Sequence, residues 1–193
     1  MSSARSKKTR DFDQFPGEYL VKTDAFIRKR VAHYYWRDDI NCATTTLKIL
    51  AEHFDLPLSD QVLDAAIGMH GAGEYGAQCG LVEGTLMFLG ILGRSRAIPD
   101  DDITSACSAF AGGFEKRFKS LSCAILRPAG FDPRNPPHLC EDITCQAVTF
   151  SLDFIQGFIA AGGTLRASGE VPPSSGSDWH HHAVAGAGCS GAR

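Results

Sequence analysis

Apolar residues recur at helical spacing along most of this chain, and this periodicity limits the fold more than any other feature. In residues 17–36 the apolar positions fall every three to four residues, at Leu20, Val21, Ala25, Phe26, Val31, Tyr34 and Tyr35. Similar patterns occupy residues 38–54, 55–70, 77–92, 105–121 and 140–162, and little alternating pattern typical of strands interrupts them. We therefore predict an all-α, single-domain helical bundle of five or six helices. Gly112 and Gly113 are expected to break the helix that contains them.

The predicted helices define one domain with two extensions. Residues 1–16 are expected to form a flexible N-terminus, and residues 17–162 the helical domain. Residues 163–193 are rich in Gly, Ser and Pro and are expected to be mostly disordered. At 193 residues, the chain is long enough for one sizeable core without disulfide or metal support.

Charge and hydropathy argue against several partners. The net charge is −3 and no basic face stands out, so we expect no nucleic-acid binding. The most apolar run, LMFLGILG, is far shorter than the ~20 residues of a membrane span, so we expect no membrane partner. The basic N-terminus lacks the apolar run of a secretory signal. These features together predict a cytoplasmic protein.

The cysteines carry the strongest functional signal in the sequence. There are seven, an odd number, and none forms a CxxC pair. Three of them fall at predicted helix starts, where backbone N–H groups and the helix dipole favour a thiolate: Cys42, Cys79 and Cys140. Cys123 follows a predicted helix. The spacing alone leaves three interpretations open, which are buried apolar cysteines, ligands of a metal or cluster, and redox-active thiols.

The glycine-rich segment GAGEYGAQCGLVEG, residues 71–84, surrounds Cys79. It is a poor phosphate loop because no Lys–Ser/Thr pair follows the glycines. It is also a poor dinucleotide fingerprint because a predicted helix, not a strand, precedes it. We interpret the glycines as residues that let the backbone approach a site at a helix start.

These cysteine segments resemble the redox-active protein family named for its cysteine pattern, C_GCAxxG_C_C. The matching segments are NCATTTLKIL, QCGLVEGTLMFLG, FEKRFKSLSCAILR and LCEDITCQAVTFSLDFI, over roughly residues 30–160. Here Gln78 replaces the glycine before the second cysteine, and Gly80 replaces the alanine after it. Cys107, Cys145 and Cys189 lie outside the pattern.

The resemblance implies an α-helical redox protein that binds an iron–sulfur cluster. Its thiolate ligands would be Cys42, Cys79, Cys123 and Cys140, with Gly80 beside the cofactor. A [4Fe–4S] cluster is the first choice and [2Fe–2S] the alternative. The expected role is electron transfer with an unknown redox partner protein, and no catalytic residue is assigned.

Two other functions stay open at this point. One is a thiol–disulfide oxidoreductase that uses a pair of these cysteines. The other is a cofactor-free helical interaction module. Gly80 and Gly84 lie four residues apart on an apolar helix and allow a close helix contact, either within the chain or in a homodimer.

Overall fold

The computed structural model describes residues 16–132 and 134–164, and this part of the chain is helical. Five helices of 12 to 20 residues make the bundle. They are α1 (Pro16–Ala32), α2 (Cys42–His53), α5 (Gly80–Ser95), α6 (Asp100–Phe118) and α8 (Glu141–Ala160). The shorter elements are the π-helical turn η2 (His33–Arg37), α3 (Asp60–Ala65), the 3-10 turn η3 (Ala66–Gly68), α4 (Gly71–Glu74) and α7 (Cys123–Leu126). The all-α prediction is confirmed.

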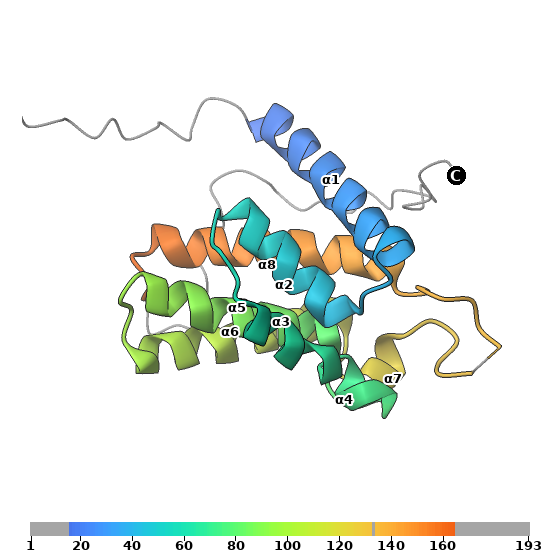
Figure 1. Ribbon diagram of the computed structural model, residues 1–193. Helices are drawn as coiled ribbons and strands as arrows, with labels where there is room; N and C mark the ends of the chain where they lie inside the picture. The colour runs from blue at the N-terminus through green and yellow to red at the C-terminus, as the bar shows by residue number, and fades with distance from the viewer. Residues whose placement is uncertain (1–15, 133, 165–193) are drawn as a thin grey trace, which may run out of the picture.

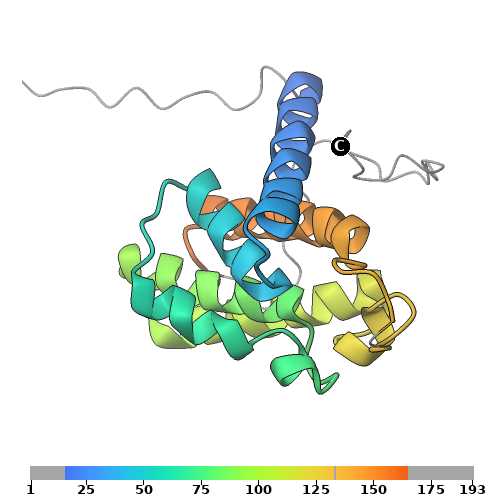
Figure 2. The ribbon, with the colours of Figure 1, turned by 45° about the vertical axis from the view of Figure 1, so that its right-hand side comes forward.

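Helices α5 and α8 lie at the centre of the bundle. Helix α5 packs against α2, α6 and α8, and α8 also packs against α1 and α2. Helix α1 leans across the top of the bundle and meets it at the α1 C-terminal end (Figures 1 and 2). The short helices α4 and α7 lie together at one end of the molecule.

The core is largely aromatic and aliphatic, with a few buried polar contacts between helices. Phe110 of α6 packs edge-on against Phe154 of α8, with ring centroids 5.3 Å apart. Thr85 of α5 and Ser151 of α8 share a buried hydrogen bond of 2.9 Å. Paired hydroxyls of this kind avoid the cost of unsatisfied polar groups in the core.

Two expectations from the sequence are corrected here. Helix α6 runs without a break through Gly112 and Gly113. A Cβ at Gly113 would lie 3.2 Å from the ring of Phe150, so this glycine allows α6 to approach α8 closely. Phe110 and Phe114 on either side are fully buried, and their packing exceeds the roughly 1 kcal/mol cost of a glycine inside a helix.

The second correction concerns α8, which by length and composition could cross a membrane. The sequence analysis found no segment of that kind. In the structure, however, Val148, Leu152 and Ile155 of α8 are buried against the other helices. A helix that is apolar on most sides suits the centre of a bundle equally well.

The two glycines of α5 are used inside the chain. A Cβ at Gly84 would lie 2.4 Å from the carbonyl oxygen of Ala43, and one at Gly80 would lie 2.6 Å from the Cys42 sulfur. Helices α2 and α5 therefore touch backbone to backbone. Because the Gly80 and Gly84 face of α5 is used within the chain, it gives no support to a homodimer, which stays a prediction. The segments expected to be flexible were 1–16 and 163–193; residues 1–15 and 165–193 of these lie outside the described residues, and Pro16 begins α1.

The α2–α5 contact can be tested with two alanine substitutions on the same helix. Gly84→Ala should lower the free energy of unfolding by about 1–3 kcal/mol, because the added methyl meets backbone atoms that cannot rotate away. Gly90→Ala is the matched control, since a Cβ there meets nothing within 4 Å. It should be neutral or stabilise by about 0.5–1 kcal/mol. Urea unfolding of both variants measures the difference, and equal stabilities would contradict the contact.

Candidate functional site

Two chain segments pair side by side and bring the second and third cysteines together. The Cys79 N–H donates to the Leu121 carbonyl at 2.8 Å, and the Cys123 N–H donates to the Ala77 carbonyl at 2.7 Å. Gln78 and Ser122 form an isolated antiparallel bridge between them. This pairing joins the start of α5 to the start of α7, at the end of the molecule where α4 and α7 meet.

The first and fourth cysteines come to the same place from two other helix starts. Cys42 is the first residue of α2, and the Asn41 side chain caps that helix by accepting the Thr44 N–H at 2.9 Å. Cys140 is the N-cap residue of α8. Both thiols interact electrostatically with Cys123. Four segments thus deliver one thiol each to a common site.

Glycines clear space around two of these thiols. Gly80 lies so close to Cys42 that a Cβ would collide with the sulfur. A Cβ at Gly71 would lie 3.0 Å from the Cβ and the sulfur of Cys123, and Gly71 also has a left-handed backbone with φ +70°. Two glycines of the glycine-rich segment therefore lie directly against Cys123 and Cys42.

Burial and mutual repulsion oppose ionisation of most of these thiols. Burial, and after it the nearby Cys140 and Cys123, raise the pKa of Cys42 to about 12. The N–H groups of Cys42 and Ala43 act in the opposite direction. Burial also raises the pKa of Cys140. Several thiolates at one site would repel one another, so the site favours neutral thiols unless positive charge is supplied.

Cys79 and Cys123 form a hydrogen-bonded pair in which one proton is lost easily and the other is held. The Cys79 thiol donates to Cys123, which lowers the pKa of Cys123 to about 7 and raises that of Cys79. Arg127 assists the ionisation of Cys123, while burial and Glu74 oppose it. Cys79 and Cys123 are only 3% and 6% exposed. The pair thus combines a ready thiolate with an adjacent thiol.

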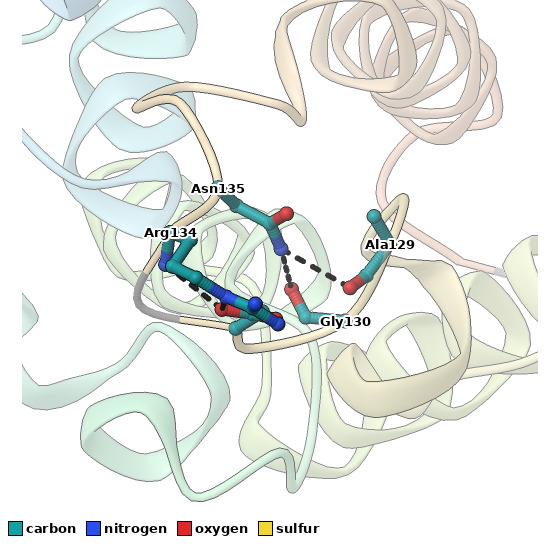
Figure 3. Close-up of polar contacts among 5 residues, drawn as sticks. Ala129, Gly130, Arg134 and Asn135 are labelled. Carbon is teal, nitrogen blue, oxygen red and sulfur yellow. Dashed lines mark hydrogen bonds and ion pairs between the residues drawn. The ribbon is translucent and has the colours of Figure 1, made fainter.

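The loop between α7 and α8 is held by its own polar contacts. The Asn135 amide donates to the carbonyls of Ala129 and Gly130, at 3.1 and 3.2 Å (Figure 3). Arg134 is paired with Asp132 in the same loop.

Two residues of the site had no signal in the sequence analysis. Tyr35 is buried beneath it and shares a 2.7 Å hydrogen bond with Thr144 of α8. Burial and the proximity of Cys42 raise the pKa of the Tyr35 phenol well above its usual value. Arg127, just after α7, acts to lower the pKa of the Cys140 thiol, against the larger effect of burial. Neither a buried tyrosine in a helix nor an arginine in a loop differs locally from many others in the chain.

The remaining cysteines do not share this arrangement. Cys107 is half-buried on α6, and burial alone raises its pKa. Cys145 is buried further along α8. Cys189 lies outside the described residues.

The four thiols do not form a closed site for a single metal ion. Within residues 16–132 and 134–164, no group of three or more His, Cys, Asp or Glu side chains is placed to hold one ion. A structural zinc site would need its ligands gathered at 2.0–2.3 Å around one centre. A multi-iron cluster distributes its thiolates over several irons, so the number and type of donors here fit such a group, although Cys79 and Cys123 would have to give up their hydrogen bond.

An all-helical domain with four cysteines brought together at helix starts defines a protein of the redox-active cysteine class. The family model described as "Putative redox-active protein (C_GCAxxG_C_C)" matches residues 40–153, and the chain belongs to that family. The match contains all four cysteines of the site. No curated protein and no solved structure matches the chain.

The thiol pair leads to a direct test. Replacing Cys79 by Ala removes the donor that stabilises the Cys123 thiolate, so the pKa of Cys123 should rise and its alkylation at pH 7 should slow. Iodoacetamide labelling of the metal-free protein across pH 5–10, with mass spectrometry of the Cys123 peptide, measures this. Cys107→Ala is the matched control and should leave the Cys123 profile unchanged. An unshifted profile for Cys79→Ala would show that the hydrogen bond does not form.

Proposed function

We propose that Cys42, Cys79, Cys123 and Cys140 hold an iron–sulfur cluster and that the protein carries electrons. The observation that supports this most is the convergence of four thiols from four separate segments. A dithiol reaction needs only two of them. Four thiolates are the usual complement of a [4Fe–4S] or [2Fe–2S] cluster.

The electrostatics of the site support a cationic occupant. Burial and mutual repulsion keep Cys42 and Cys140 protonated in the metal-free chain. A coordinating metal deprotonates a thiol outright and removes the repulsion between neighbouring thiolates. Metal binding would thus release protons and stabilise the fold, because the cost of placing several thiols together is offset.

The chain supplies the surroundings that such a cofactor requires. The Ala43 N–H is directed toward the Cys42 sulfur, and the Leu81 N–H toward the Cys79 sulfur. N–H donors to sulfur and exclusion of water both tune a cluster potential. Gly80 provides the clearance beside Cys42. When bound, the cluster would supply a one-electron redox couple.

The finer assignments follow from the same site. A [4Fe–4S] cluster is our first choice because each thiol comes from its own segment, and a [2Fe–2S] cluster is the alternative. We also propose a cytoplasmic location, since the four closely placed thiols of the site are free, while the disulfide-bonded Cys145 lies apart from them. An oxidising compartment would favour their pairing as disulfides.

One observation favours a second candidate, a thiol–disulfide exchange centre. The Cys79–Cys123 hydrogen bond places a ready thiolate beside its partner. The Cys123 thiolate would attack a disulfide of a substrate and release one substrate thiolate. Cys79 would then displace the second, so that the Cys79–Cys123 disulfide forms as the substrate disulfide is reduced to two thiols.

The cluster is tested by anaerobic purification with iron and sulfide analysis and a visible spectrum. The wild-type chain should be coloured and contain equal amounts of iron and sulfide. Single Cys→Ser changes at 42, 79, 123 or 140 should each reduce the cluster content several-fold, while Cys107→Ser should retain it. A colourless wild-type protein without iron after anaerobic reconstitution would overturn the proposal.

The second candidate makes a separate prediction for the metal-free protein. Mild oxidation should lower the count of free thiols by two, and mass spectrometry should locate the new disulfide at Cys79 and Cys123. Cys79→Ser or Cys123→Ser should prevent that loss, whereas Cys107→Ser should not. A thiol count that stays constant on oxidation would exclude the exchange centre.

A further inference from the structure

The imidazole of His138 joins the segment before α8 to the turn that ends α1. It stacks on the ring of Tyr35, with centroids 4.7 Å apart, and meets the ring of Trp36 edge-on, with centroids 5.0 Å apart. Its Nε2 lies 3.1 Å from a carboxylate oxygen of Asp39. The His138 side chain is only 14% exposed. Three residues from one end of the chain therefore enclose a ring from a segment about 100 residues away.

Two hydrogen bonds continue this contact along α8. The Trp36 Nε1 donates to Glu141 Oε2 at 2.9 Å, and the hydroxyls of Tyr35 and Thr144 share a buried bond of 2.7 Å. The π-helical turn η2 thus contacts positions 138, 141 and 144. Because residues three apart lie on one face of a helix, these contacts hold the start of α8 along one side.

Two of the contacting residues have an unusual backbone conformation. Asp39 has φ +49° and His138 has φ +59°, in the left-handed region that residues other than glycine rarely adopt. Such conformations persist where the surrounding structure holds them, and they gather at functional sites. Asp39 lies three residues before Cys42, and His138 lies two residues before Cys140. A strained residue therefore leads into each of these cysteines, and the two strained residues contact each other.

We propose that Trp36 and His138 form a clamp that positions Cys140 against Cys42, so that this half of the site is set before a cofactor binds. The other two thiols of the site are joined by backbone hydrogen bonds instead. Trp36 and His138 are positioning residues, since they act through the segments that carry the ligands. The clamp rests on the proposed function, because it concerns the same four-cysteine site, but its geometry is tested without a cofactor.

The experiment measures which thiols lie together in the metal-free, full-length chain. Dibromobimane, which links two neighbouring thiols, is added under anaerobic conditions. Mass spectrometry of the digested protein then quantifies the Cys42–Cys140 product and the Cys79–Cys123 product. The second product is an internal reference, because the backbone pairing that joins Cys79 to Cys123 does not involve the clamp.

Three variants are compared with the wild type. His138→Asn removes the stacked ring but keeps a residue type that adopts left-handed backbone more readily than most. Trp36→Phe keeps an aromatic ring but loses the N–H donor. His53→Asn is the matched control, because the ring of His53 also packs against aromatic rings, at the opposite end of the 12-residue helix that Cys42 begins. Thermal unfolding of each variant shows whether the fold is retained.

The clamp predicts that His138→Asn yields several-fold less Cys42–Cys140 product, with the Cys79–Cys123 product unchanged. Trp36→Phe should shift the ratio of the two products in the same direction by less, and His53→Asn should match the wild type. After anaerobic reconstitution with iron and sulfide, His138→Asn should lose its iron at about tenfold lower chelator concentration than the wild type.

Several outcomes would overturn the clamp. They are a wild-type chain that gives no Cys42–Cys140 product, a wild-type product ratio in His138→Asn, and an equal loss of that product in His53→Asn. If His138→Asn does not fold, Trp36→Phe decides, and a wild-type ratio there overturns the clamp. An unchanged chelator concentration would overturn its role in cofactor binding. A wild-type chain that takes up no iron would instead overturn the proposed function, while the cross-linking result would stand.

Discussion

The close contact between α2 and α5 is the constraint on which the rest of the site depends. Gly80 and Gly84 bring the α5 backbone against Ala43 and the Cys42 sulfur, with no side chain between them. That approach sets Cys42 next to the start of α5, where Cys79 precedes the helix. Larger residues at either glycine would separate the helices and with them two of the four thiols. The α2–α5 contact therefore determines both the helix packing and the site geometry. A substitution that separates these helices also separates the cysteines.

A site that gathers buried thiols has an electrostatic cost that the fold only partly offsets. Each buried thiolate raises the pKa of its neighbours, and the N–H groups at the starts of α2 and α5 recover only part of that energy. A protein stabilised by such a cluster of thiols alone would gain nothing over alanines of similar packing. The repulsion between the thiolates is removed when they bind a cation, take up protons or form a disulfide bond. This ties the observed geometry to redox chemistry.

The sequence predicted the local features of this structure well and the long-range ones poorly. Helical periodicity identified the long helices, and the positions of Cys42, Cys79 and Cys140 at helix starts were predicted correctly, because such signals depend on a few neighbouring residues. The Cys79–Cys123 pairing depends on backbone hydrogen bonds between distant segments, which no local pattern reports. The break predicted in α6 does not occur, because aromatic packing outweighs the low helix propensity of its glycines.

The four cysteines of the site are not equivalent, and this difference relates the two candidate chemistries, cluster binding and disulfide formation. Cys79 and Cys123 are directly hydrogen-bonded, whereas Cys42 and Cys140 interact with the others through space. In a metal-free chain the first pair is therefore poised to form a disulfide, and oxidation there would remove two ligands at once. A cluster, if bound as we propose, would protect the pair by occupying both thiolates, so loss of iron and disulfide formation would be linked. The charge of Arg127 lowers the pKa of both Cys123 and Cys140, one cysteine from each side.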